Sequence, residues 1–151
     1  MKRFHFPLES VQKLRLRQLE IEESKLGSLY RELEALDETG RKLQLDLSEE
    51  ARRVTDPALV LRSFDFETLD KFRQFAARRG SQLQLQKQNC QQRIAEQLSR
   101  IREAKRKHEL LEKLRLRDLA GWQLLWNKEV DALAEEAFIA TWKRRPRRAN
   151  G

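Results

Sequence analysis

The fold is decided by residues 19–54, which read LEIEESKLGSLYRELEALDETGRKLQLDLSEEARRV. The apolar residues of this stretch fall on one alternating three- and four-residue spacing, and they are Leu19, Leu26, Leu29, Leu33, Leu36, Leu43, Leu47 and Val54. This spacing is the seam of a left-handed coiled coil. Only Glu22, Gly40 and Glu50 interrupt it. The stretch therefore predicts a long helix that buries one narrow face.

This first helix is predicted to run over residues 8–54. No proline lies between Leu8 and Val54, and Thr55-Asp56-Pro57 should end the helix because proline disfavours helical backbone at the residue before it. At its start, Leu8, Val11 and Leu14 follow a different phase from the later seam, which predicts a stutter near residues 14–19.

A second helical pattern runs from about residue 66 to Trp142, interrupted only by Gly80-Ser81 and Gly121. The first part of its seam is less apolar, because many glutamines lie between the seam residues. These seam residues are Leu69, Ala76, Leu83, Cys90, Ile94, Ile101, Ala104 and Leu111. It strengthens through Leu111, Leu114, Leu119, Trp122, Trp126, Leu133 and Ala137. This helix also needs a partner for its apolar face.

Two long helices joined by about ten residues predict an all-α fold, an antiparallel two-helix coiled-coil hairpin in a single domain of residues 1–151. The second helix is longer, so either its C-terminal stretch projects unpaired or Arg78-Arg79-Gly80-Ser81 breaks it. We favour the break, which gives a connector and short helical tip over residues 55–81 and a paired helix over 82–142. The basic residues 143–151 are predicted to be disordered.

The composition excludes several classes of protein. The charged fraction (37%) nearly equals the hydrophobic fraction (39%), and 5 glycines and 3 prolines are too few for a sandwich or barrel. The single Cys90 allows no internal disulfide. No apolar run approaches the roughly 18 residues of a membrane span, and the first residues show no signal peptide. We expect no direct membrane insertion.

The net charge of +8 is unevenly distributed. It is 0 over residues 1–55, +6 over 56–108, −3 over 109–142 and +5 over 143–151. A neutral first arm and an acidic late segment argue against nucleic acid as the partner, and no base-stacking or groove-reading motif is present.

No motif indicates catalysis. His5 and His108 are isolated, and the acidic residues alternate with lysine and arginine at the spacing of a solvated helix surface. His108 is expected to lie at the surface or at the edge of the seam. We expect no enzymatic activity, no cofactor and no metal.

Three aromatic groups exceed what a coiled coil requires. Phe4 and Phe6 precede the first helix and either pack on the neighbouring helix or meet a partner. Trp122 and Trp126 share a helix face, and Trp142 lies beside the basic tail. The third group lies at the predicted tip and comprises Phe64, Phe66, Phe72 and Phe75 among Arg62, Lys71, Arg73, Arg78 and Arg79. For it, packing at the bend and contact with a partner both remain open.

Both ends of the chain carry a family resemblance. The opening Phe4-x-Phe6-Pro7-Leu8-Glu9-x-Val11-x-x-Leu14-Arg15 resembles the start of the bacterial flagellar export protein FliJ family. The later stretch Leu111-Glu112-Lys113-Leu114-Arg115-x-Arg117, followed by Glu129 and Leu133-Ala134-Glu135-Glu136-Ala137, resembles the second half of that family. It departs from the family pattern at Ala134 and Glu136, where aspartate and an apolar residue are expected.

The resemblance implies a non-enzymatic coiled-coil stalk, similar to the central shaft of rotary ATPases, in the flagellar export apparatus. Its implied partners are the export ATPase FliI, the regulator FliH, the export gate protein FlhA and export chaperones, at the cytoplasmic face of the membrane. For the ATPase ring we expect contacts from Leu8, Val11, Leu14, Leu114, Arg115, Arg117, Trp122 and Trp126. For the gate we expect contacts from Phe64, Phe66, Phe72, Arg73, Phe75, Arg78 and Arg79.

Two other functions stay open from the sequence. The first is the equivalent stalk of a virulence type III secretion system, and the second is a basic coiled coil that binds nucleic acid. Whether the chain acts alone or pairs with a second copy also stays open.

Overall fold

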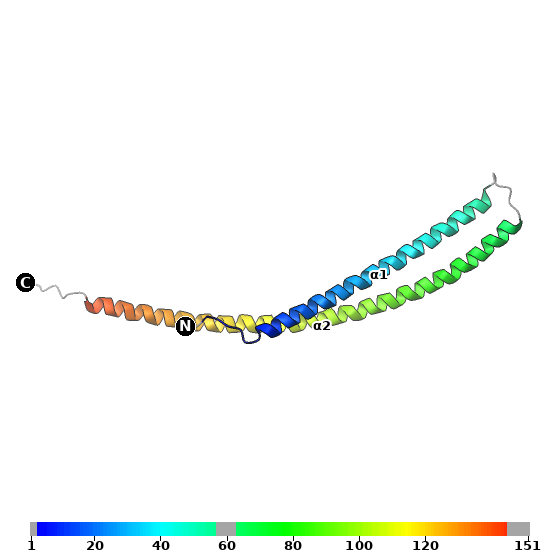
Figure 1. The fold of residues 1–151 in the computed structure, drawn as a ribbon. Helices are drawn as coiled ribbons and strands as arrows, with labels where there is room; N and C mark the ends of the chain where they lie inside the picture. The colour runs from blue at the N-terminus through cyan, green and yellow to red at the C-terminus, as the bar shows by residue number, and fades with distance from the viewer. Residues whose placement is uncertain (1–2, 57–62, 145–151) are drawn as a thin grey trace, which may run out of the picture. The chain divides into compact units, whose positions relative to one another are not determined.

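The computed structural model describes residues 3–56 and 63–144, with side chains from residue 66 onward in the second range. It contains two helices, α1 (Glu9–Thr55) and α2 (Ser63–Arg144), and no strand within the described ranges (Figure 1). The all-α prediction is confirmed, and α1 ends at Thr55 as predicted. Residues 57–62 of the predicted connector and residues 145–151 of the predicted tail lie outside the described residues, whereas Lys143 and Arg144, predicted to be disordered, belong to α2.

The helices contribute to two compact units. The hairpin unit comprises Gln18–Ala104, and the terminal unit comprises Met1–Arg17 together with Lys105–Gly151. Each unit therefore contains a part of α1 and a part of α2.

In the hairpin unit, α1 and α2 run side by side in opposite directions (Figure 1). Three contacts between the helices fix this direction, because their α2 partners fall in number as the α1 residues rise. Gln97 contacts Glu22, the Cys90 Sγ donates to the Leu29 carbonyl oxygen at 3.4 Å, and Lys87 Nζ lies 2.6 Å from the Asp37 carboxylate. The predicted antiparallel hairpin is therefore present.

The buried residues of this unit follow the predicted seams. On α2 the buried residues Leu69, Ala76, Leu83, Cys90 and Gln97 recur every seven residues, and Ile94 is also buried. Of these, only Gln97 was not part of the predicted seam. On α1 Val54 is buried, and the other seam leucines from Leu19 to Leu47 are half-buried, as is usual when only two helices share a core. Glu22, Gly40 and Glu50 occupy the seam positions that the apolar pattern had left vacant.

The predicted break at residues 78–81, and with it the separate tip over 55–81, is wrong. α2 continues through Arg78-Arg79-Gly80-Ser81 without interruption, and Gly80 does not adopt a left-handed conformation. A single glycine inside a helix costs only about 1 kcal/mol, and Ala76 and Leu83 are buried on either side of it. That packing keeps the segment helical.

In the terminal unit, the start of the chain packs on α2. Phe6 is 3% exposed, and the Glu9 N–H donates to the Phe6 carbonyl oxygen at 3.2 Å as the chain turns into α1. The half-buried residues of this part are Leu8, Gln12 and Arg15, whereas Val11 and Leu14 are exposed. This is the same alternating spacing as in the rest of α1, so the predicted stutter near 14–19 is wrong.

Past Trp122, α2 is exposed to solvent over the part of the chain that the structure describes. Every residue from Gln123 to Arg144 is exposed, although the helix continues to Arg144. Of the two sequence-based alternatives, the projecting C-terminal stretch is the one observed. Neither helix, over the residues described, combines the length and apolarity that crossing a membrane requires.

Candidate partner-binding surfaces

All eight residues expected to contact an ATPase ring lie in the terminal unit. Three of them, Leu8, Leu114 and Trp122, are half-buried and form part of its packing. The exposed members are Val11, Leu14, Arg115, Arg117 and Trp126. The unit therefore contains two exposed α1 residues and three exposed α2 residues of this set.

Aromatic contacts organise this unit. The rings of Trp122 and Trp126 are stacked, with centroids 5.7 Å apart and 16° between their planes. Phe4 lies against Trp122 at 6.0 Å in a tilted arrangement. The predicted common face of the two tryptophans is confirmed, and Trp126 keeps one side open at 38% exposure.

Packing on the neighbouring helix and contact with a partner were both considered for the N-terminal phenylalanines, and packing is the one observed. Phe6 is buried and Phe4 is half-buried against Trp122, so both pack on the neighbouring helix. A shallow hollow beside them is lined by Arg3, His5, Glu9 and Arg115. His108, expected at the surface or seam edge, is half-buried, and its Nδ1 makes no hydrogen bond in the structure described.

The described residues expected to contact an export gate lie in the hairpin unit. Phe66 and Phe75 are exposed, and so are Arg73 and Arg78, while Phe72 and Arg79 are half-buried. The rings of Phe72 and Phe75 lie 6.3 Å apart, which accounts for part of the aromatic excess by self-packing. The side chain of Phe64 lies outside the described residues.

Sequence reasoning missed a groove between the helices of the hairpin unit. It has a volume of about 640 Å³, an apolar floor that includes Leu36, Leu43 and Leu83, and a rim that includes Arg73 and Lys87. Gly40 and Gly80 line it from opposite helices, and no side-chain atom lies within 4 Å of where their Cβ atoms would be. The signal was present in the sequence, because Gly40 interrupts the α1 seam and Gly80 lies next to the small residues Ala76 and Ala77.

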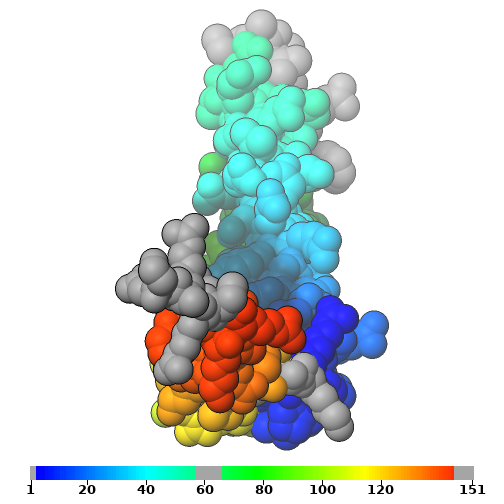
Figure 2. Space-filling view, turned by 90° about the vertical axis from the view of Figure 1, so that its left-hand side faces the viewer, coloured from blue at the N-terminus to red at the C-terminus, as the bar shows by residue number. Residues whose placement is uncertain are grey.

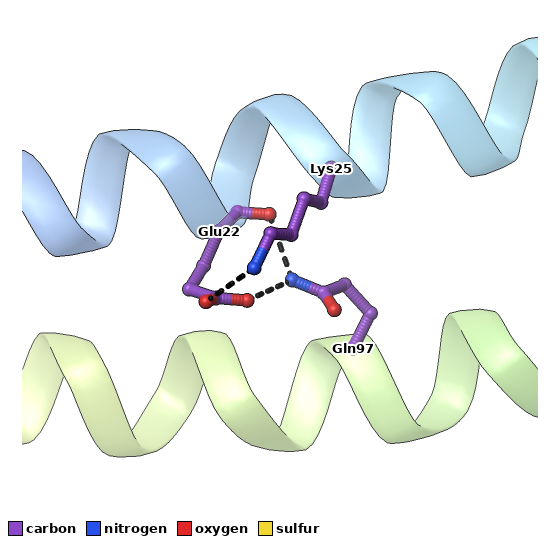
Figure 3. A network of polar contacts seen from close by, with 3 residues as sticks. All are labelled: Glu22, Lys25 and Gln97. Atoms are coloured by element: carbon purple, nitrogen blue, oxygen red, sulfur yellow. Dashed lines mark hydrogen bonds and ion pairs between the residues drawn. The ribbon is translucent and has the colours of Figure 1, made fainter.

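A polar network crosses the hairpin near one end of this unit (Figure 3). The Gln97 amide donates to the Glu22 carbonyl oxygen at 2.9 Å and also to the Glu22 carboxylate, while Lys25 Nζ lies 3.1 Å from that carboxylate. The hydrogen bond from Gln97, with a smaller contribution from Lys25, lowers the pKa of Glu22. Farther along, the Glu32 carboxylate pairs with Arg93 and raises the pKa of that guanidinium.

Sequence reasoning also missed large apolar side chains that lie away from both seams. In the C-terminal part of α2 they are Leu124, Leu125, Phe138 and Ile139, all exposed. A hollow there is lined by Ala134, Glu135, Phe138 and Ile139. The described ranges contain no group of three His, Cys, Asp or Glu residues placed to hold a metal ion.

The described residues form an antiparallel helical hairpin, and the C-terminal part of α2 is exposed. The sequence matches no family model and no curated protein, and no solved structure matches the fold.

Proposed function

We propose that this protein is a non-enzymatic stalk of the bacterial flagellar protein export apparatus. In this role it binds the export ATPase FliI and its regulator FliH, promotes assembly of the ATPase ring, and connects the ring to the gate protein FlhA and to export chaperones. It acts at the cytoplasmic face of the membrane without inserting into it. The proposal starts from the resemblance at both ends of the chain.

The observation that carries the proposal is the surface of the terminal unit. Val11 and Leu14 are 37% and 54% exposed on α1, and Trp126 is 38% exposed on α2. Arg115 and Arg117 are exposed on the same part of α2, and Arg117 also lies 3.6 Å from Asp118. Exposed tryptophan and arginine side chains are typical of protein-binding surfaces.

This surface suits a ring as the partner. A stalk within a ring meets repeated subunits through many weak contacts rather than one deep pocket, and the nucleotide is hydrolysed by the ring itself. Stiff helices with exposed apolar and cationic side chains meet that requirement without any catalytic group.

The gate contact is assigned to the hairpin unit. Phe66 and Phe75 are exposed there, and Arg73 and Arg78 are exposed on the same helix. These side chains combine apolar area with positive charge, so a partner with an acidic, partly apolar surface is favoured. The hairpin unit and the terminal unit would then have different partners.

Co-sedimentation with the purified export ATPase tests the proposal. The full chain is expected to sediment with the ATPase, and Leu14→Asp should weaken this binding about tenfold or more because it places a charge in the apolar contact. The matched control is Leu45→Asp, since Leu45 is also exposed on α1 but lies in the hairpin unit. Equal binding by both variants would show that Leu14 and the surface around it in the terminal unit do not contact the ATPase.

A further inference from the structure

The groove between the two helices of the hairpin unit contains a gap in the seam. Gly40 interrupts the α1 seam between Leu36 and Leu43, and Gly80 lies on the α2 seam three residues before the buried Leu83. Both glycines line the groove, and no atom of another part of the chain lies within 4 Å of where either Cβ would be. Protein interiors are ordinarily close-packed, so this space is unfilled at a place where side chains would be expected.

The groove is elongated. Its lining residues span 36–47 of α1 and 73–87 of α2, which are about 16 and 21 Å long at the rise of an α-helix. Its volume of about 640 Å³ lies within the range of small-molecule sites. In Figure 2, α1 of this unit, drawn blue to cyan, lies in front of α2, drawn green. The unit has no third helix within the described residues that would cover the groove.

Four charged side chains among the described residues line the groove, and three of them have ion-pair partners. Lys87 Nζ lies 2.6 Å from the Asp37 carboxylate, and Arg41 lies 2.8 Å from the carboxylate of Glu38. Arg73 is exposed and makes no hydrogen bond or ion pair with any residue that the structure describes. The groove therefore has one uncompensated charge, which is positive.

This charge lies at one end of the groove. Arg73 is the first lining residue of α2, whereas Lys87, the last one, is neutralised by Asp37 at the opposite end. Asp70, one turn before Arg73, accepts a hydrogen bond from the Gln74 amide at 3.0 Å instead. Between the two ends the groove is lined mainly by leucine, alanine and glycine. A ligand with one negative charge at the end of a long apolar body is complementary to this arrangement.

The width of the groove excludes a helix as the occupant. Spread over its length, the volume gives a mean cross-section of about 30 to 40 Å². An α-helix with its side chains is about 10 to 12 Å across and is too wide to enter. A single hydrocarbon chain is narrow enough.

We propose that the groove binds a long-chain carboxylate, such as a fatty acid. The Arg73 guanidinium would pair with the carboxylate, and the hydrocarbon chain would run along the leucines into the space beside Gly40 and Gly80. The inference does not depend on the proposed role in export, because it rests only on the groove of the hairpin unit. Since Arg73 also belongs to the expected gate contacts, a bound carboxylate would compete with that contact.

Dansylaminoundecanoic acid, a fluorescent fatty acid whose emission rises in apolar surroundings, serves as the probe for the full-length chain. Three competitors share a twelve-carbon chain and differ in the head group. Laurate has a carboxylate, dodecanol has no charge, and dodecyltrimethylammonium has a positive charge. Each is used below the concentration at which it forms micelles.

The head group should determine the order of displacement. Laurate is expected to displace the probe at about a tenfold lower concentration than dodecanol, and dodecyltrimethylammonium should be the weakest competitor. Arg73→Gln should remove the preference for laurate over dodecanol. The matched control is Arg78→Gln, which changes an exposed arginine of the same helix outside the groove and should leave the preference unchanged.

Filling the gap should block binding. Gly40→Leu places a side chain in the groove and should lower the affinity for the probe about tenfold or more. Gly27→Leu is the control, because Gly27 also lies on α1 with open space around it but does not line the groove. Circular dichroism confirms that both variants keep the helix content of the parent.

Three results would overturn the proposal. Equal displacement by laurate and dodecyltrimethylammonium would show that no cation selects the ligand. Equal binding of the probe by Gly40→Leu and Gly27→Leu would place the probe outside the groove. Sedimentation of the chain with phosphatidylglycerol vesicles, without displacement of the probe by laurate, would assign the apolar surface to a lipid bilayer instead of a single fatty acid.

Discussion

Gln97 is joined to Glu22 across the hairpin by two hydrogen bonds from one amide group, the first to the backbone carbonyl oxygen at 2.9 Å and the second to the carboxylate. Gln97 is 5% exposed and takes a seam position that the pattern of the rest of α2 would give to an apolar residue. A buried amide with a single acceptable partner fixes which residues of the two helices lie opposite each other. The pair therefore sets the register of the hairpin unit.

Replacement of Gln97 by alanine should destabilise the chain. Glu22 loses the two hydrogen bonds from Gln97, and the smaller side chain leaves a cavity in the seam, so the urea midpoint should fall. Urea unfolding followed by circular dichroism measures it. The double variant Gln97→Leu with Glu22→Leu should recover the lost stability, because two apolar residues then fill the seam. A double variant less stable than Gln97→Ala would contradict this role.

The Glu22 carboxylate should make stability depend on pH. Its pKa lies below the ordinary value of 4.5, chiefly because Gln97 donates to the charged form. The unfolded chain therefore binds more protons, so this contribution is complete above the unfolded pKa of about 4.5 and is lost as pH falls through the folded pKa. The melting temperatures of the parent and Glu22→Gln should differ at pH 7, and the difference should shrink as the pH falls below 4.5. If the difference in melting temperature grew as the pH fell, the direction assigned to the pKa shift of Glu22 would be wrong.

Filling the groove at Gly40 should stabilise the hairpin. No side-chain atom lies within 4 Å of an added Cβ, and the backbone at Gly40 is helical. Gly40→Ala should therefore add about 0.5 to 1 kcal/mol by helix propensity alone. Gly121→Ala is the matched variant, since that glycine also has open space around it but lies in the terminal unit. Destabilisation by Gly40→Ala alone, measured by urea unfolding, would show that the groove must stay empty.

The Cys90 thiol should report opening of the hairpin. Its side chain is fully buried and its Sγ donates to the Leu29 carbonyl oxygen. Reaction with Ellman's reagent requires the helices to separate, so it should be about a hundredfold slower in buffer than in denaturant. Ser81→Cys in a Cys90→Ala background is the control, because residue 81 is exposed and its thiol should react at once. Fast reaction of native Cys90 would mean that the pairing at Leu29 is transient.

Much of the fold could be predicted from the sequence, because the spacing of the apolar residues identifies the seam of a coiled coil. Leu19 to Val54 and Leu69 to Ile94 face the interface as the spacing predicted. The break near Gly80 was wrong since local helix propensity is weak against the packing of its neighbours. The phase at the start of α1 was wrong for a different reason. Apolar Val11 and Leu14 are exposed, while the polar Gln12 and Arg15 lie on the seam.

The candidate surfaces were only partly predictable. The residues at both ends of the chain were identified from motifs, and the structure brings those of the ring-contact set into one unit. The groove had a signal in the sequence, because Gly40 interrupts the α1 seam. The exposure of α2 beyond Trp122 had none, because it depends on where pairing stops and hence on the relative lengths of the two helices. In the sequence, Trp122, Trp126 and Leu133 all belong to the same apolar spacing. Only the structure distinguishes them, because Phe4 packs against Trp122, whereas Trp126 and Leu133 are exposed.

The most direct test of the proposed function is the ATP hydrolysis rate of the flagellar export ATPase, measured alone and with increasing amounts of the full-length chain. The proposal predicts that the rate rises and then saturates as rings form, and that Leu14→Asp prevents the rise while Leu45→Asp does not. A rate that stays unchanged at every amount of added chain, with no rings visible by electron microscopy, would contradict it.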